Sequence, residues 1–455
     1  MDKIIEIIKA DTKRKEGKYR ARKYYRYRPV YSREDEQYFI KNGIEYPVKS
    51  KKNEIYINYF KMLVTQKIDY LLSKKPTYDK KLKDIGINVW TMMDKLVLNA
   101  SLDSQTWLHP YVTNNKLNYI VVQDAEIIPE YTEDNKTLKS LIRYYKEDDI
   151  LYVEIWANNG VKKLQYDNKN NLLDEKIEAH YTSKYYAGDT LEKSVDSNFP
   201  TIPFIKLENN KDVTSDIEDI EGLIIAYNAI CTGFVENVEK FQEALMVLRG
   251  YVGDKDSIKK IMKDIQEAKG VNVSKDGSLD YMKVDIPVEA RNTLLNILRD
   301  VIFLIGRGVD PNKLAEGEQI TNTVIKSRYV QLDLKSSDTE KRINEFYDNF
   351  IEFLNSYKSI SFDNTLEFNK SMLINESELI DDCIKSLNVV SLETILEYHP
   401  FVSKHGVKEE LKRLKKEKDE AAAEAKKQFD LMNSDPNNPP GNNDNNDNNK
   451  NNPTN

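Results

Sequence analysis

The stretch Ser215–Arg249 reads SDIEDIEGLIIAYNAICTGFVENVEKFQEALMVLR and decides the fold class. Its apolar residues recur at alternating spacings of three and four, the spacing of one face of an α-helix. They are Ile217, Ile220, Ile224, Tyr227, Cys231, Phe234, Val238, Phe241, Leu245 and Leu248. Ser215 and Glu218 have the pattern of a capping box. We predict one helix over Ser215–Arg249, about 50 Å long, with a seam that needs a partner.

Further helices are predicted downstream of this stretch. Residues 250–286 form a small α/β insert after Gly250 and Gly253. Pro287 opens a helix over Val288–Ile305, because proline favours the first turn of a helix. A Gly/Pro loop over 306–320 then leads to a long helix, roughly Thr321–Ser356. Two helices separated by an insert therefore precede one long helix.

The N-terminal half combines a helix with strands. Glu54–Leu72 has helical apolar spacing and stops before Pro76. Four short apolar runs separated by Asp, Asn and Lys turns predict an antiparallel meander. These runs are Leu117–Val122, Ile127–Tyr131, Leu138–Tyr145 and Ile150–Trp156. The stretch that follows, up to Pro200–Pro203, has the pattern of a loop. The class is therefore α+β, mainly helical.

The C-terminal part becomes progressively more polar. Ser361–Phe368 is predicted as a short strand and Ser377–Phe429 as helical. Within it, Val407–Phe429 is rich in Lys, Glu and Ala, which is typical of a solvated helix with i,i+4 charge pairs. Residues 433–455 hold 12 asparagines. Such a segment cannot bury enough apolar surface to offset ordering entropy, so we predict disorder there.

Composition excludes several classes of protein. The 455 residues are 40% apolar and 31% charged, enough for real cores, so disorder of the whole chain is excluded. Two cysteines exclude a disulfide scaffold and a cysteine-based zinc site, and no two of the four histidines share a metal-ligand spacing. The net charge of −7 provides no overall basic field for nucleic acid. No apolar run is long enough to predict a membrane span.

No catalytic motif or cofactor-binding motif stands out in the sequence. Gly306-Arg307-Gly308 resembles a glycine turn, but no Lys-Ser/Thr pair follows at the spacing of a phosphate-binding loop. No nucleophile elbow or His-Glu-x-x-His run occurs. His109 stands beside Pro110 and close to Trp107, which favours a packed histidine. We predict no enzyme activity, no metal site and no cofactor.

A basic, tyrosine-rich segment lies near the N-terminus. Residues 13–33 carry ten Lys or Arg against one acid, Glu16, interleaved with tyrosines. Basic side chains bind phosphates and aromatic faces stack on bases. One interpretation is direct nucleic-acid contact; the other is a solvated segment lying on an acidic neighbouring subunit. The candidate phosphate contacts are Lys13, Arg14, Lys15, Arg20, Arg22, Lys23 and Arg26.

The long seam stretch is strongly acidic. Ser215–Arg249 contains seven acids and two bases. An acidic face beside a polyanion offers no attractive site, so DNA could slide past it without being held. The alternative is an ordinary acidic surface. The acids that we assign to a tunnel are Glu236, Glu239 and Glu243.

An ordered series of blocks resembles the portal proteins of long-tailed phages of Gram-positive bacteria. Early in the chain these blocks are Asn58-Tyr59-Phe60, Val64, Lys67 and Tyr70–Pro76, then Ile127-Ile128-Pro129 and Ile142–Tyr145. Later ones are Ile202-Pro203-Phe204, Asn209-Asn210, Ser215-Asp216, Leu223–Asn228, Ser391–Thr394 and Pro400. The resemblance covers most of residues 20–410. Relatives often carry Ser-Gly where this chain has Asn322-Thr323, which affects the loop's details and not the family.

The resemblance implies a ring of twelve subunits at one capsid vertex, with a wing, stem, clip and crown. Carried over, the parts are 1–214 (N-terminal wing), 215–249 (first stem helix with its wing lead-in), 250–286 (clip), 287–305 (second stem helix), 306–320 (tunnel loop), 321–378 (long wing helix and strand), 379–432 (crown) and 433–455 (disordered tail). The tunnel-loop residues are Arg307, Asp310, Pro311, Lys313, Glu316 and Glu318.

The implied partners are further copies of the chain, double-stranded DNA, the terminase large subunit, a head-completion adaptor, and the major capsid and scaffolding proteins. The implied location is the virion, with assembly in the host cytoplasm and no membrane association. The alternative left open by the residues alone is a scaffold or filament protein that uses its helical seams for assembly and has no role with DNA.

Overall fold

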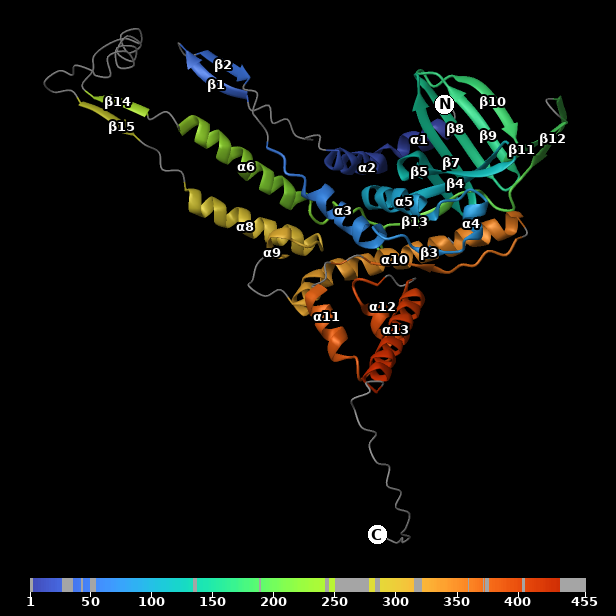
Figure 1. Cartoon of the computed structure of the whole chain (residues 1–455). Helices are drawn as coiled ribbons and strands as arrows, with labels where there is room; N and C mark the ends of the chain where they lie inside the picture. The colour runs from blue at the N-terminus through green and yellow to red at the C-terminus, as the bar shows by residue number, and fades with distance from the viewer. Residues whose placement is uncertain are drawn as a thin grey trace. The chain divides into compact units, whose positions relative to one another are not determined.

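The chain is described from a computed structural model (Figure 1). The described residues are 3–26, 36–41, 44–49, 55–133, 137–187, 190–241, 245–249, 278–282, 287–314, 321–358, 360–370, 372, 376–402 and 406–433. The chain divides into two compact units. Unit 1 holds Met1–Glu316 and Lys326–Met372, and unit 2 holds Gly317–Ile325 and Leu373–Asn455.

The first part of unit 1 contains five helices. They are α1 (Lys3–Ala10), α2 (Thr12–Tyr25), α3 (Tyr59–Leu72), α4 (Lys81–Asp84) and α5 (Val89–Asp103). The predicted helix over Glu54–Leu72 begins only at Tyr59, because the Asn58 side chain accepts a hydrogen bond from the Lys61 backbone N–H and caps it. Phe60 and Val64 of α3 are fully buried in the main core. The same core contains buried residues of α2, α5, the later helices α8 (Val288–Ile305) and α10 (Asn322–Lys358), and several strands, so it joins these elements.

Three antiparallel sheets cover most of the N-terminal half. One has the order β13-β4-β5 and one the order β10-β9-β8-β7-β6, and β11 pairs with β12. Their bounds are β4 (Gln105–Thr113), β5 (Lys116–Gln123), β6 (Ile127–Tyr131), β7 (Leu138–Glu147), β8 (Ile150–Ala157), β9 (Gly160–Tyr166), β10 (Leu172–Glu178), β11 (Tyr181–Ala187), β12 (Thr190–Ser197) and β13 (Ile205–Glu208). The short 3₁₀ turn η1 (Asp124–Glu126) joins β5 to β6.

The predicted meander is confirmed for β6, β7 and β8, which pair in sequence order. Its first run, Leu117–Val122, is a strand but pairs with β4 instead. The loop predicted up to Pro203 is wrong, because strands β10, β11 and β12 lie there. Most residues of β10 and β12 are exposed, so these strands lack the apolar alternation that marks a half-buried strand.

A pair of helices, α6 (Glu221–Phe241) and α8 (Val288–Ile305), runs side by side from the core (Figure 1). The single helix predicted over Ser215–Arg249 is wrong at both ends. Ser215 Oγ donates to the Ser101 carbonyl, so only the Glu218 half of the capping box forms. At the other end β14 (Leu245–Arg249) pairs with β15 (Ser278–Met282), because a short apolar run suits a strand as well as a helix. The helix predicted over Val288–Ile305 is confirmed.

The long helix α10 (Asn322–Lys358) confirms the helix predicted over Thr321–Ser356. It begins in unit 2, and its later turns bury Phe346 and Phe350 in the core of unit 1. The short helix α9 (Pro311–Leu314) precedes it. Two further strand pairs complete unit 1: β1 (Glu36–Lys41) with β2 (Ile44–Lys49), and β3 (Thr77–Tyr78) with β16 (Leu366–Glu367). The strand predicted over Ser361–Phe368 is thus confined to two residues.

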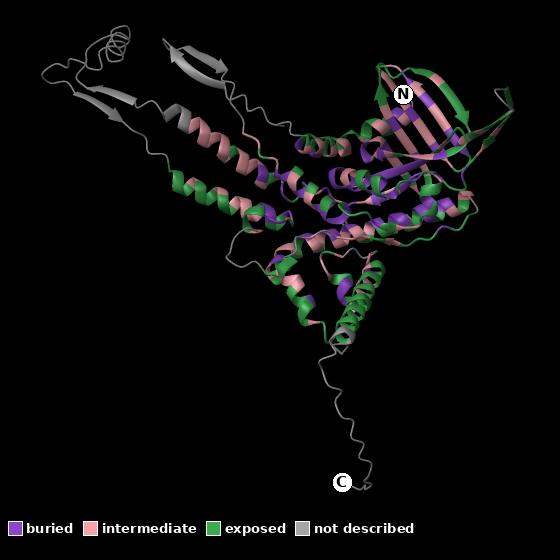
Figure 2. Cartoon of the chain, viewed as in Figure 1, coloured by how far each residue is buried: buried purple, intermediate pink, exposed green. Residues whose placement is uncertain are grey.

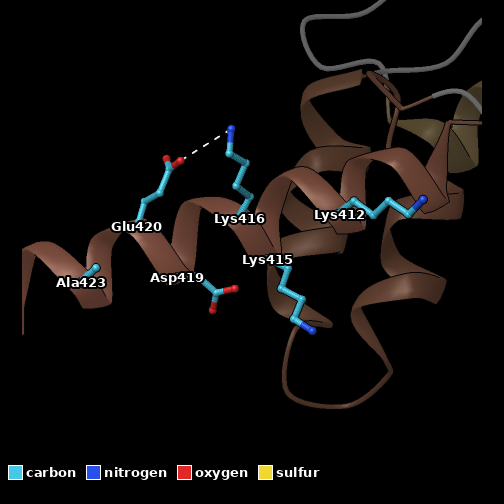
Figure 3. Close-up of a pocket in the computed structure, with 6 residues that line it drawn as sticks. All are labelled: Lys412, Lys415, Lys416, Asp419, Glu420 and Ala423. Atoms are coloured by element: carbon cyan, nitrogen blue, oxygen red, sulfur yellow. Dashed lines mark ion pairs between the residues drawn. The ribbon is translucent and has the colours of Figure 1, made fainter.

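Unit 2 contains α11 (Glu376–Lys385), α12 (Leu392–Tyr398) and α13 (Val407–Asn433). The predicted solvated helix is confirmed, since every residue of α13 from Lys415 to Phe429 is exposed. A shallow hollow lies on α13, and Figure 3 shows the side chains that line it. Lys416 and Glu420 form an ion pair there at 3.6 Å. The lining residues of the hollow are Lys412, Lys415, Lys416, Asp419, Glu420 and Ala423. One helix supplies them all, so the hollow is open surface. The predicted disordered tail lies outside the described residues from 434 onward.

Candidate functional site

The first half of the predicted tunnel loop is fixed to the core. The Gln66 side-chain amide on α3 donates to the Val309 carbonyl at 2.7 Å and accepts from the Val309 N–H at 3.0 Å. A Cβ added to Gly308 would come within 2.1 Å of Leu63 Cδ2, so glycine permits this close approach. Between the two glycines, Arg307 adopts a left-handed φ of 53°. The glycine turn that resembled a phosphate-binding loop is therefore a packing feature.

Two of the predicted loop residues that the structure describes, Asp310 and Lys313, form ion pairs with α8. Asp310 pairs with Arg299 at 3.2 Å, and Lys313 pairs with Asp300 at 2.9 Å. Pro311 opens α9. Glu316 and Glu318 lie outside the described residues. The described base of the loop, Gly306–Leu314, is thus fixed to the core. The Asp310 and Lys313 side chains are engaged within the chain, and the Arg307 side chain is exposed.

A buried charged cluster lies behind this base of the loop. The Asp216 carboxylate, which is 4% exposed, pairs with Lys67 of α3 at 2.6 Å and with Lys335 of α10 at 3.3 Å. The Lys67 side chain is fully buried. Asn209 accepts from Lys67 Nζ at 2.8 Å and donates to Asp216 at 2.8 Å. Lys335 also donates to the Gly306 carbonyl at 3.1 Å. This cluster, the Asp216 node, joins the lead-in to α6 with α3, α10 and the first residue of the loop.

Burial and charge act in opposite directions within the Asp216 node. Burial raises the pKa of Asp216, but the ammonium groups of Lys335 and Lys67 outweigh it and hold that pKa well below its usual range. Burial lowers the pKa of Lys67 to about 8, against the opposing effect of the Asp216 carboxylate. Asp216 is therefore ionised at neutral pH, and the node carries a net positive charge.

The Asp216 node is absent from the candidate sites predicted above, although the sequence of α3 carries one signal for it. Phe60, Val64, Lys67 and Leu71 share one 4-3-4 stripe of α3, and a lysine on a buried stripe needs a buried partner. The sequence does not identify that partner, because Asp216 stands far away along the chain and its acidic neighbours are exposed.

Substituting Lys67 by methionine tests the protonation state of the node. Folded Lys67 has a pKa of about 8 against an ordinary value of 10.5, so between these values the unfolded chain binds a proton that the folded chain does not. The stability of the wild type should therefore rise relative to K67M as pH increases from 7 to 10. Urea unfolding at several pH values measures this. A difference that stays constant or falls over this range would contradict the assignment.

The two predicted stem helices pack together at their outer turns as well as at the core. The Arg291 guanidinium of α8 lies 5.4 Å from the Phe234 ring of α6. At the other end the Tyr59 ring of α3 packs edge-on against two rings. Its centroid lies 5.1 Å from that of Tyr227 on α6 and 5.8 Å from that of Phe303 on α8. Helix α3 thus contacts both α6 and α8 through Tyr59.

Of the three predicted tunnel acids, Glu236 is the one whose side chain lies within the described part of the chain. Glu236 lies on α6 and is half-buried. Glu239 also lies on α6, but its side chain is outside the described set, and Glu243 lies outside the described residues. The grouping of these three acids on one surface therefore stays a prediction.

The described part of the basic segment, residues 13–26, lies on helix α2 and its C-cap, and several of its cations face inward. Arg14 and Lys18 pair with the fully buried Asp124, and Arg22 pairs with the fully buried Asp103 at 2.5 Å. Lys15 Nζ lies 3.3 Å from the centre of the Tyr144 ring.

These ion pairs hold α2 to α5 and η1, so most of the inward-facing cations are engaged in the fold. Arg20 pairs with Glu221 at 3.1 Å with half of its side chain exposed. Lys13, Lys23 and Arg26 are exposed. A phosphate contact by α2 stays a prediction, and these exposed side chains are the ones placed to make it.

The structure accounts for the histidine nearest the sheets. His109 Nδ1 lies 2.8 Å from the Pro203 carbonyl, and its ring stacks on Phe204 at 4.3 Å. Burial lowers its pKa to about 4. The predicted packed histidine is confirmed. Among the described residues, no three His, Cys, Asp or Glu side chains gather as a metal site would require. No described helix has both the length and the apolarity needed to cross a membrane.

Comparison with known proteins identifies the family. The family model described as phage portal protein, SPP1 Gp6-like, matches residues 6–424. The chain belongs to this family. The match begins in α1 and ends in α13, so it includes residues of both units. The resemblance seen in the sequence is confirmed.

Two curated relatives agree with the family. This portal protein is 26% identical over 441 residues to the portal protein of Clostridium phage phiCD119, which covers 88% of this chain and 93% of the relative. It is 24% identical over 388 residues to the portal protein of Bacillus phage SPP1, which covers 80% of this chain and 75% of the relative. Both relatives come from phages of Gram-positive bacteria.

Proposed function

We propose that this portal protein assembles as a ring of twelve copies at one vertex of the capsid. The ring forms the channel through which double-stranded DNA is packaged, retained and ejected. The observation that carries this proposal is the family match over nearly the whole chain. The protein acts in the virion after assembly in the host cytoplasm. Family membership disfavours the alternative of a scaffold or filament protein without a DNA role.

The contacts that fix the start of the predicted tunnel loop support the assignment of a channel. Gly306–Leu314 is held by α3, α8 and the Asp216 node, which supports a tunnel loop that is anchored at its start to the core and the second stem helix. Residues 306–320 are assigned to the tunnel loop, and α6 and α8 to the stem. Wing, clip and crown follow the predicted boundaries.

The protein performs no bond chemistry in this proposal. ATP hydrolysis belongs to the terminase large subunit, which docks on residues 250–286 and later gives way to a head-completion adaptor. Major capsid and scaffolding proteins contact the ring during head assembly. A deletion of 250–286 that preserved the ring and left packaging normal would contradict the docking assignment.

Charge reversal at Glu236 tests the role of the stem acids. If this side chain faces DNA, Glu236→Lys creates a phosphate contact in every copy and should slow DNA passage several-fold at low salt, with less effect at high salt. In vitro packaging at two ionic strengths measures this. Glu147→Lys, an exposed charge reversal on β7, is the matched control and should behave as the wild type. Equal rates for E236K and wild type would remove Glu236 from the channel wall.

A further inference from the structure

A groove of about 510 Å³ lies between helix α10 and the strands of unit 1. Figure 2 shows buried residues alternating with exposed ones on the turns of α10 beside these strands. The floor of the groove consists of buried apolar side chains, which are Trp107, Ile202, Phe204, Ile205 and Phe353. An apolar floor with a few polar groups around it is typical of a binding site. We call this space the sheet–helix groove.

Two asparagines on opposite walls of the sheet–helix groove have unused side-chain amides. Asn158 follows β8 and Asn349 lies on α10; both are exposed, and neither side chain bonds to another described residue. A primary amide can donate to a backbone carbonyl and accept from a backbone N–H. Asn115 pairs in this way with β11 of the same chain, since its amide donates to the Lys184 carbonyl at 2.5 Å and accepts from the Lys184 N–H at 2.9 Å. The groove can therefore hold the backbone of an extended segment.

Strand β13 borders the groove with an edge that no other described strand covers. It pairs with β4, and the Asn209 N–H donates to the Ser104 carbonyl at the end of this pairing. Because hydrogen-bonded and non-hydrogen-bonded pairs alternate along antiparallel strands, the N–H and C=O of Lys206 point away from β4. Lys206 is itself part of the groove lining. An open strand edge of this kind is a template for a further extended chain.

The charge of the groove favours a basic occupant. Lys206 and Glu352 are the charged residues of the described lining. Lys206 Nζ pairs with Glu208 at 2.7 Å and lies 5.6 Å from the centre of the Tyr131 ring, so this cation is already engaged. Glu352 on α10 is exposed and forms no ion pair with the described cations. The rim thus keeps one uncompensated carboxylate, which a basic side chain would complement.

We propose that the sheet–helix groove binds an extended peptide segment of another protein. An apolar side chain of that segment covers the groove floor, its backbone bonds to the amides of Asn158 and Asn349, and a neighbouring Lys or Arg pairs with Glu352. This mode combines recognition of an extended backbone with a pocket for one side chain. The site goes beyond the proposed channel function, and a single copy of the chain is enough to form it.

A charge swap at Glu352 tests the proposal, with a random peptide library displayed on ribosomes as the probe and the full-length protein as the target. Selection on the wild type should enrich peptides in which an aromatic or aliphatic residue stands next to Lys or Arg. Selection on Glu352→Lys should instead enrich Asp or Glu at that place, because the charge of the rim is reversed. Glu345→Lys, an exposed charge reversal on α10 outside the groove lining, is the matched control and should enrich the same peptides as the wild type.

Filling the groove provides a second readout. Asn349→Trp adds a large side chain from an exposed position of α10, so the thermal midpoint should stay at its wild-type value while the space over the floor is lost. A fluorescent peptide taken from the wild-type selection should bind N349W at least tenfold more weakly in an anisotropy titration. Asn344→Trp, at an exposed position of the same helix outside the lining, should bind the peptide as the wild type does.

The possible outcomes separate the occupants of the groove. Equal binding of the peptide to wild type and N349W, or the same charge preference for wild type and E352K, would overturn the groove as a peptide site. If an excess of N349W, whose own groove is filled, displaced the peptide from the wild type, a second copy of the chain would be the occupant and a separate partner would be refuted. Because one copy forms the site, these results stand whether or not the protein assembles into rings.

Discussion

Replacing Asp216 by alanine is expected to lower the free energy of unfolding by about 3–5 kcal/mol, the cost of leaving buried charges without their partner. Lys67 is fully buried and pairs with Asp216 at 2.6 Å, so D216A strands an ammonium group in the core. Lys335 loses the same partner. The Gly306 end of the loop should loosen with it, because Lys335 bonds to that carbonyl.

Chemical denaturation in urea measures the loss, and limited proteolysis within 306–320 measures the loosening. Asp219→Ala is the matched control, because Asp219 stands three residues away in the same turn and is exposed. D219A should stay within about 0.5 kcal/mol of the wild type. If D216A and D219A unfolded at the same urea concentration, the Asp216 node would have no structural importance.

Replacing Asp124 by alanine is also expected to lower the free energy of unfolding by about 3–5 kcal/mol. Its carboxylate is fully buried and accepts from Trp107 Nε1 at 2.8 Å and Gln105 Nε2 at 2.7 Å. Arg14 and Lys18 of α2 pair with it as well. D124A should therefore release α2 in addition to destabilising the sheet β13-β4-β5.

Hydrogen exchange of the α2 amides, together with the thermal midpoint, measures this result. Glu16→Ala on the exposed face of α2 serves as the control. Exchange in α2 that stayed as slow in D124A as in E16A would show that other contacts hold this helix.

Sequence periodicity predicted two of the helices closely. Val288–Ile305 was predicted to the residue, and α10 to within two. The same periodicity extended α6 too far at both ends. Ser215–Ile220 and Leu245–Arg249 continue the 3-4 spacing, but tertiary bonds from Ser101 and strand pairing with Ser278–Met282 decide their conformation.

The candidate site was less accessible to sequence reasoning. The tunnel-loop residues were placed in one segment, but the partners that fix them, Gln66 and Arg299, come from two other helices. The basic run on α2 suggested a nucleic-acid surface, whereas Asp103 and Asp124 neutralise part of it within the chain. Pairing between charges distant in sequence depends on the tertiary fold, which no local pattern encodes.

A closed ring of identical subunits around an open channel is the central proposal for this protein. Negative-stain electron microscopy of the purified protein, with native mass spectrometry of the same sample, tests it most directly. We expect rings of about twelve subunits with a central hole. An open filament, or a small dimer as the largest assembly even with scaffolding protein present, would contradict it.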